Sequence, residues 1–196
     1  MNKATVAIDA GHGPAKPKAY IPGVDEQAVN WILATRIELG LQDHGITVIR
    51  TRPDYWLTPG LAQRVATANQ ARADFFLSIH LNDLKDKNGN PDPRPKGTEV
   101  YHYGPSTAGA AAAKIMAQAL QAGTGRKRVK IVASPSPDYP TTLYVLKNTR
   151  MPALLLEAAY ITNPEEGRLF TGPAFPAAFV ESTVRGTVAA LRELGR

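Results

Sequence analysis

Short apolar runs alternate with helix-periodic stretches along this chain. Four of the runs predict strands, and these cover residues 6–8, 46–49, 75–79 and 153–156. Two more strands are predicted over residues 98–103 and 143–146. The predicted strands are therefore distributed along the whole chain.

The stretches between these strands have the apolar spacing of helices. A helical period extends from Asp25 to about Gln42, where the first helix is predicted. Thr58 and Pro59 have the residue types of an N-cap and a first helical position. A second helix is therefore predicted to begin there, with Leu61 on its buried face.

Capping residues mark the helices of the second half of the chain. Ser106 is predicted to cap an alanine-rich helix that continues to about Gln121. Asn163 followed by Pro164 has the pattern of another helix start. A final helix is predicted over residues 174–194.

The alternation of strands and helices predicts an α/β fold, with a mostly parallel, twisted sheet and helices on both faces. The length suits a single domain over residues 1–196, without repeats or a linker. The strand at 98–103 is compatible with parallel or antiparallel pairing. Residues 82–97 and 123–138 are rich in turn-forming residues, so both are expected to be irregular, and the first is expected to border a cleft.

The composition restricts the possible ligands and partners of the protein more than it restricts the fold. The chain has no cysteine, which excludes disulfides and thiolate zinc sites and leaves His, Asp and Glu as ligands for a transition metal. The formal net charge of +6 favours anionic partners such as an acidic wall polymer. The densest basic run, residues 126–130, has no aromatic residue on which a base could stack, so nucleic acid is not an expected partner. We also expect no membrane span, and no secretory signal is visible.

Candidate chemistry lies at the ends of three predicted strands. His12 stands between two glycines after the first strand, His80 follows the strand at 75–79, and Glu157 follows the strand at 153–156. In open α/β sheets the ligand crevice lies outside the carboxyl ends of the strands, so we expect these three side chains to converge. Catalytic zinc is commonly held by two histidines and a carboxylate. The pattern therefore predicts a metal site with His12 and His80 as ligands and a general base nearby.

The carboxylate ligand is not fixed by the pattern alone. Five acids lie near predicted strand or helix ends, namely Asp9, Asp25, Glu26, Asp83 and Glu157. Glu26 falls in the first turn of the first helix, from which it can reach back over the sheet edge, although an acid there also stabilises the helix dipole. Glu157 follows four apolar residues, and a carboxylate at a buried strand end suits general base work on water activated by a metal.

Taken together, the motifs of this chain resemble those of a known enzyme family. In chain order they are IDAGHG, DEQ with an asparagine three residues later, TR before a helix that ends in AN, ADFFLSIHLN, GTEVY and LYVLKNTRMPALLLEAAYITNPEE. The combination covers nearly the whole chain and resembles the zinc-dependent N-acetylmuramoyl-L-alanine amidases of type 3, found among bacterial autolysins and phage endolysins. The resemblance implies Zn²⁺ as cofactor and peptidoglycan as substrate.

The resemblance also implies a role for each candidate residue. The zinc ligands of the family fall on His12, Glu26 and His80, and its catalytic glutamate falls on Glu157. In this family zinc polarises the amide between the lactyl group of N-acetylmuramic acid and L-alanine. The glutamate deprotonates the attacking water and can then protonate the leaving amine. Asn82, two residues after His80, is a candidate for contacting the peptide.

Two other function classes stay open from the sequence. A zinc exopeptidase or carboxypeptidase could use the same kind of metal site on a similar sheet, with a fixed cation that captures a terminal carboxylate. A non-catalytic cell-wall-binding domain could retain the fold without turnover, although the presence of Glu157 disfavours it. Lys147 and Arg150 are candidates for contacting a carboxylate. Action in the cell wall or periplasm is expected, by a clipped mature form or a phage-type enzyme, and we expect a monomer.

Overall fold

The computed structural model describes residues 3–14, 19–137 and 139–196. The strands are β1 (Thr5–Ala10), β2 (Ala19–Ile21), β3 (Val24–Asp25), β4 (Thr47–Arg50), β5 (Phe75–Asn82), β6 (Thr98–Tyr103), β7 (Val129–Ser134) and β8 (Ala153–Tyr160). The helices are α1 (Glu26–Asp43), α2 (Leu61–Gln70), α3 (Thr107–Thr124), α4 (Tyr144–Asn148), α5 (Pro164–Arg168) and α6 (Ala174–Glu193).

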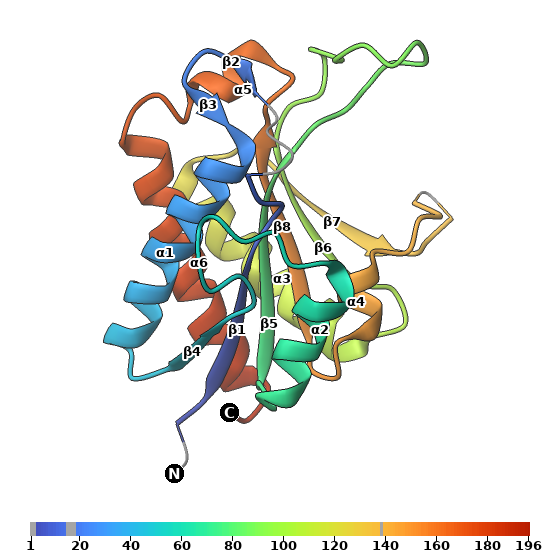
Figure 1. Cartoon of the computed structure of the whole chain (residues 1–196). Coiled ribbons are helices and arrows are strands. Elements are labelled where there is room, and N and C mark those ends of the chain that lie inside the picture. The colour runs from blue at the N-terminus through green and yellow to red at the C-terminus, as the bar shows by residue number, and fades with distance from the viewer. Residues whose placement is uncertain (1–2, 15–18, 138) are drawn as a thin grey trace.

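The main sheet has six strands in the order β4-β1-β5-β8-β6-β7. Strands β4, β1, β5 and β8 are parallel to one another, β6 pairs antiparallel with β8, and β7 is parallel to β6. The mostly parallel α/β sheet is therefore confirmed, and the strand at 98–103 uses both kinds of pairing. The carboxyl ends of β1, β5 and β8 lie together at one edge of the sheet, which we call the site edge; the carboxyl terminus lies at the opposite end (Figure 1).

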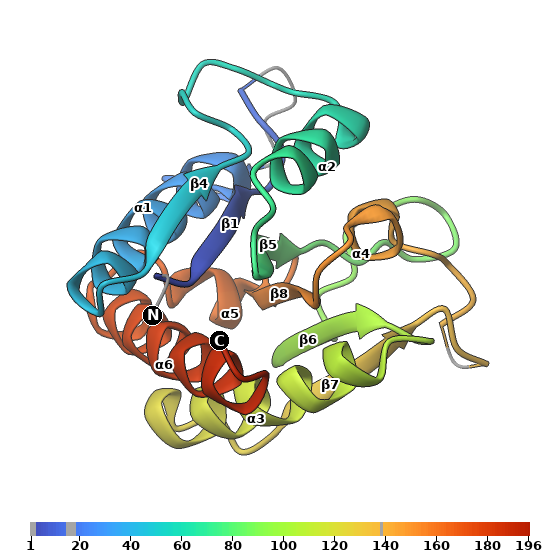
Figure 2. The same ribbon diagram turned by 90° about the horizontal axis from the view of Figure 1, so that it is seen from below.

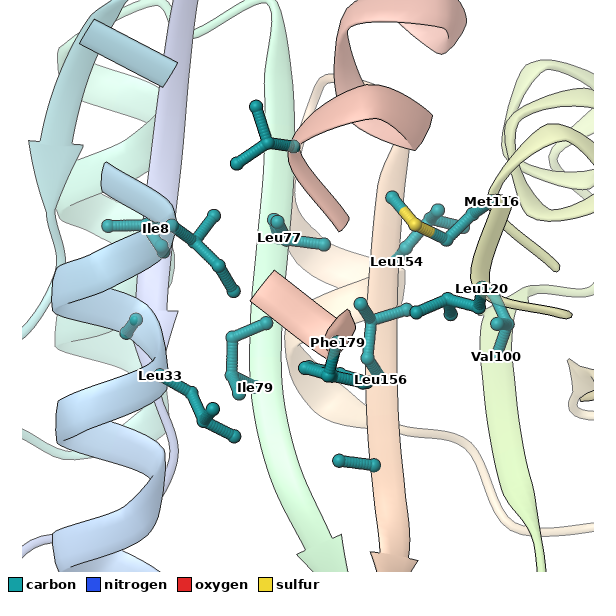
Figure 3. Packing of buried hydrophobic residues seen from close by; sticks show 14 of the residues in the cluster. Ile8, Leu33, Leu77, Ile79, Val100, Met116, Leu120, Leu154, Leu156 and Phe179 are labelled. Atoms are coloured by element: carbon teal, nitrogen blue, oxygen red, sulfur yellow. The ribbon is translucent and has the colours of Figure 1, made fainter. Parts of the chain in front are cut away.

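Helices cover both faces of this sheet, as predicted. Figure 2 shows α1, α3 and α6 on one side and α2 and α4 on the other. The larger hydrophobic core lies beneath α1, α3 and α6, where Ile8, Ile79 and Leu156 of the strands lie near Leu33 and Phe179 of the helices (Figure 3). Because strand side chains alternate between faces, the neighbours of these core residues face α2 and α4.

Several predicted helix starts agree with the structure and one does not. The Ser106 hydroxyl accepts a hydrogen bond from the Gly109 N–H at 3.0 Å, and the Asn163 side chain caps α5. The second helix, however, begins at Leu61 with Gly60 as its N-cap, so the predicted start at Thr58 and Pro59 was wrong. No helix among the described residues combines the length and the apolar character needed to cross a bilayer.

Two element predictions in the second half were also wrong. Residues 143–146 were predicted as a strand, but 144–148 form the short helix α4, whose Val145 and Leu146 are buried. A run of four apolar residues does not distinguish a strand from a buried helical turn. Residues 123–138 were predicted to be irregular, but they contain β7 at the sheet edge; residue 138 lies outside the described residues.

Candidate metal centre

Three side chains come together at the site edge. His12 Nε2 lies 2.9 Å from Glu26 Oε1, and His80 Nδ1 lies 3.5 Å from the same oxygen. One ligand atom from each of these residues lies within 4.8 Å of the other two. Zinc bonds of about 2.0–2.2 Å in a tetrahedral site place ligand atoms roughly 3.3–3.6 Å apart. The donor set and its spacing therefore fit one metal ion such as zinc.

The local backbone explains why these side chains meet. His12 has φ 60°, in the left-handed region that residues other than glycine rarely adopt, so β1 ends in a sharp turn there. Gly11 packs directly against the His80 ring, and a Cβ at this position would overlap that ring. Asp25 accepts a hydrogen bond from the Gln27 N–H at 3.1 Å and so starts α1 at Glu26. Each residue is thus delivered by a different element.

Glu26 is buried, with a side-chain exposure of 2%. Burial by itself raises the pKa of this carboxyl, but hydrogen bonds from His12 and His80 outweigh that effect and hold the pKa well below its usual range. The Leu81 N–H also donates to Glu26 Oε1 at 3.4 Å, and the Asn30 amide does so at 3.5 Å. The carboxylate is therefore charged at neutral pH and held in place from several sides.

Two buried arginines hold the backbone at His12. The His12 carbonyl oxygen accepts hydrogen bonds from Arg52 Nη1 at 3.1 Å and from Arg64 Nη2. Arg64 Nη1 donates to the Ala10 carbonyl at 2.8 Å and is paired with Asp9 Oδ1 at 2.7 Å. Arg52 and Arg64 are 1% and 3% exposed. This arginine clamp, Arg52 with Arg64, fixes the turn that presents the His12 ring to Glu26, and sequence reasoning missed it.

Replacing Arg64 by lysine is expected to weaken metal binding about 10- to 100-fold, the loss typical for a group that orients a ligand. Lysine keeps the charge beside Asp9 but cannot reach the Ala10 and His12 carbonyls together, because it lacks the guanidinium fork. Competition with a chromophoric chelator measures the affinity. Arg50→Lys is the control, since Arg50 pairs with Glu38, away from the metal-binding group. Equal affinity in Arg64→Lys and the wild-type protein would show that the clamp does not position His12.

The remaining acids have other partners. Asp9 accepts hydrogen bonds from the Ser78 and Thr51 hydroxyls. Burial by itself raises the pKa of Asp9, but Arg64 and these hydroxyls outweigh that effect and hold the pKa below its usual range. Asp25 is the cap of α1. Asp83 Oδ2 accepts a hydrogen bond from the Tyr20 hydroxyl at 3.1 Å. Of the five acids considered, Glu26 alone belongs to the metal-binding group.

Glu157 lies beside His80 in the sheet. The two residues are register partners in the parallel pair β5–β8, so their side chains project from the same face, the one that carries α2 and α4. On its other side, Glu157 is the register partner of Glu99 in β6. The structure thus brings Glu157 next to one member of the metal-binding group, as the strand-end argument predicted.

Asn82 contacts a protein carboxylate in this structure. Its side-chain amide donates to Glu99 Oε2 at 3.0 Å, and the Tyr101 hydroxyl donates to the same oxygen at 2.6 Å. Lys130 Nζ lies 3.2 Å from Glu99 Oε1. Glu99 therefore gathers several polar groups next to Glu157. The motif GTEVY contains Glu99, but nothing in the sequence distinguished it from an ordinary strand residue.

A cleft of about 300 Å³ opens beside the metal-binding group. Its lining includes His12 and His80, together with Thr58, Pro59, Gly60, Leu61, Leu143, Tyr144, Val145 and Leu155. The start of α2 forms one wall and α4 the other. Residues 82–97 do not contribute to this lining, contrary to expectation. Arg150 precedes β8 at the edge opposite the site, so it does not face this cleft.

Comparison with known proteins identifies the family. The family description "N-acetylmuramoyl-L-alanine amidase" matches residues 6–188, most of the chain. The chain belongs to this family. It is 31% identical over 194 residues to the N-acetylmuramoyl-L-alanine amidase LytC of Bacillus subtilis, covering 96% of this chain and 36% of LytC. It is 28% identical over 173 residues to the endolysin of Bacillus phage SPP1, covering 87% of this chain and 59% of the endolysin.

Solved amidase structures have the same fold. The N-acetylmuramoyl-L-alanine amidase from Clostridium difficile 630 superimposes with a TM-score of 0.85, at 26% identity and with 98% of each chain covered. The chain therefore corresponds to the whole of that amidase structure, although it spans only about a third of the length of LytC.

Proposed function

We propose that this chain is a peptidoglycan amidase that hydrolyses the amide between the lactyl group of N-acetylmuramic acid and L-alanine, with residues 1–196 forming its catalytic domain. The observation that carries the proposal is the group His12, Glu26 and His80 at an open cleft, with Glu157 on the adjacent strand. The group occurs in a chain of the amidase family. Two histidines and a glutamate form an established zinc ligand set, so Zn²⁺ is the proposed cofactor.

His12, Glu26 and His80 would hold the zinc ion, which would supply a Lewis acid for the scissile carbonyl and for the attacking water. Glu157 is the proposed general base, which takes a proton from the attacking water and then gives it to the nitrogen of the leaving alanine. The arginine clamp keeps the turn at His12 rigid during these steps. Water and substrate reach the site through the cleft, where His12 keeps a side-chain exposure of 28%.

The cleft itself disfavours an exopeptidase. Recognition of a terminal carboxylate requires a fixed cation that is free to bind it. Among the described residues that line the cleft, Arg64 is the one arginine or lysine, and its guanidinium is already engaged by Asp9 and by the Ala10 and His12 carbonyls. An internal amide, flanked by sugar and peptide, suits this site better than a free chain end.

We further propose that the protein acts at the bacterial cell wall, as its relatives among amidases and endolysins suggest. The formal net charge of +6 attracts it to an acidic wall polymer. We also propose that Asn82 contacts the peptide. Its side chain is hydrogen-bonded to Glu99, and Glu99 is the register partner of Glu157.

Mass spectrometry of digested peptidoglycan tests this function. Zinc-loaded protein is expected to release free peptides that begin with alanine, and chelated protein is expected to release none. The apo protein reloaded with zinc serves as the control for damage by the chelator. Intact lactyl–alanine linkages, produced by protein that is folded and loaded with zinc, would contradict the proposal. Removal of a terminal residue from the stem peptide, with the lactyl–alanine linkage intact, would instead support the exopeptidase alternative.

A further inference from the structure

An exposed tryptophan precedes the cleft-lining segment 58–61 by two residues. Trp56 is 76% exposed, more than any other large hydrophobic side chain in the described residues. It belongs to the segment between β4 and α2, in which Leu57 is 50% exposed. Leu61, the first residue of α2, is 55% exposed, so its predicted place on the buried face of that helix was wrong. Large exposed apolar surfaces next to a cleft commonly mark binding sites. We call Trp56, Leu57 and Leu61 the rim patch.

The rim patch is continuous with the cleft. Thr58 to Leu61 form part of the cleft lining. The Leu57 carbonyl and the Thr58 side chain lie so close to Gly13 that a Cβ on Gly13 would overlap the Thr58 hydroxyl. Two residues of chain span at most about 7 Å, so Trp56 lies within that backbone distance of Thr58. A ligand whose reacting bond lies near His12, and which runs along the wall formed by residues 58–61, therefore comes to the rim patch.

Contacts with Asp54 and Tyr55 hold Trp56 in place. The backbone N–H of Trp56 donates to Asp54 Oδ1 at 2.8 Å, and the Tyr55 ring meets the indole edge-on, with ring centroids 4.9 Å apart. The Tyr55 hydroxyl accepts a hydrogen bond from the Gln27 side chain at 3.1 Å, and the Tyr55 ring contacts Trp31 with ring centroids 5.9 Å apart. Gln27 is the neighbour of Glu26. The first turn of α1 therefore carries a metal-ligand candidate and also contacts Tyr55, the residue that packs against Trp56.

A rigid, exposed indole loses little conformational entropy on binding a flat apolar partner. In the proposed substrate the scissile carbonyl belongs to the lactyl group, which is attached directly to a sugar ring, so the glycan strand must pass close to the metal-binding group. The axial C–H groups of a hexosamine ring form an apolar face, and their positive polarisation matches the negative face of an indole. Peptide side chains offer no comparable ring at a fixed distance from the bond.

We propose that Trp56 is a sugar-stacking subsite, which binds the hexosamine next to the muramyl residue and so selects glycan-linked substrates. This inference rests on the proposed function and names the part of the substrate that the rim patch recognises. It predicts that the enzyme binds at least two sugar rings, one at the cleft and one over Trp56. The subsite would bind sugar whether or not zinc is present, because no metal ligand belongs to it.

Calorimetric titration of the full chain with a tetramer of β-1,4-linked N-acetylglucosamine tests the subsite separately from catalysis, because this probe has no lactyl amide. Trp56→Ala is expected to weaken binding about 3- to 10-fold, and Trp56→Phe, which keeps a flat ring, is expected to retain most of it. Leu39→Ala, at a 57% exposed position of α1, is the control and is expected to bind like the wild-type protein. Equal binding by the wild-type protein and Trp56→Ala would overturn the proposal.

The kinetic test compares a disaccharide peptide with a monosaccharide muramyl peptide. Wild-type protein is expected to prefer the disaccharide in kcat/KM, and Trp56→Ala is expected to lose that preference through KM while it cleaves the monosaccharide normally. An equal loss on both substrates would overturn the sugar subsite and indicate a peptide contact. Cleavage of neither substrate by the wild-type protein would contradict the proposed function, whereas the titration would still report on the subsite.

Discussion

Replacing Glu157 by glutamine is expected to lower kcat about 10²- to 10⁴-fold, the range that a general acid–base contributes. Glutamine has nearly the same size but cannot accept a proton from water or return it to the leaving amine. The proposed ligands His12, Glu26 and His80 are untouched, so zinc stoichiometry and affinity are expected to stay at the wild-type values. Turnover of a soluble muramyl peptide, followed by mass spectrometry, measures kcat.

The matched control is Glu165→Gln, the same chemical change at a carboxylate that is 73% exposed and pairs with Lys96 at the protein surface. This control is expected to be as active as the wild-type protein. Activity of Glu157→Gln within about fivefold of wild type would remove Glu157 from its proposed role, since a fivefold change is below what a general base supplies. Loss of zinc from the variant would assign Glu157 to metal binding instead.

Much of the candidate site could be predicted because strand ends carry positional information. His80 and Glu157 each follow an apolar run, and parallel strands place their carboxyl ends at the same edge of a sheet. Glu26 required a further clue, since an acid in a first helical turn usually serves the helix dipole. The resemblance to the amidase family supplied that clue, and the contact between Glu26 and His12 agrees with it.

The arginine clamp could not be predicted in this way. Arg52 and Arg64 are separated from His12 by 40 and 52 positions; Arg52 belongs to the motif TR, but neither residue carried a predicted role. Their burial depends on where the α2 start and the end of β4 pack against the turn after β1. Only the folded chain reveals that their guanidinium groups satisfy backbone carbonyls that would otherwise be buried without donors.

The misassigned elements have a common physical cause. Strand β7 lies at the sheet edge, where one side faces solvent, so Lys130 interrupts its apolar pattern and the preceding basic residues favour a loop. Helix α4 is one turn long, too short to show a helical period. Edge strands and single turns are determined by their packing partners. The central strands are buried on both faces, and their own sequence was enough to predict them.

Replacing Glu26 by glutamine is expected to weaken zinc binding by more than about 100-fold, the upper loss for groups that only orient a ligand. The change removes the negative charge that both histidines face, while the amide keeps the shape of the side chain. The histidines hold the pKa of Glu26 below its usual range, so the charged carboxylate stabilises the metal-free protein and Glu26→Gln is expected to lower that stability; the effect of zinc is therefore measured within each variant. Chelator competition measures the affinity, and thermal unfolding with and without zinc measures the stabilisation that binding provides.

A second carboxylate on the same helix serves as the control. It separates the loss of a metal ligand from the general effect of removing a carboxylate from α1. Glu38→Gln, also on α1, removes a carboxylate that pairs with Arg50 away from the metal-binding group. We expect zinc to raise the melting temperature of the wild-type protein and of Glu38→Gln alike, because a ligand that binds only the native state stabilises it. The same zinc concentration is expected to leave Glu26→Gln nearly unchanged. If Glu26→Gln gained as much as the wild-type protein, the ion would be held elsewhere, and the contact of Glu26 with His12 and His80 would be an ordinary buried ion pair.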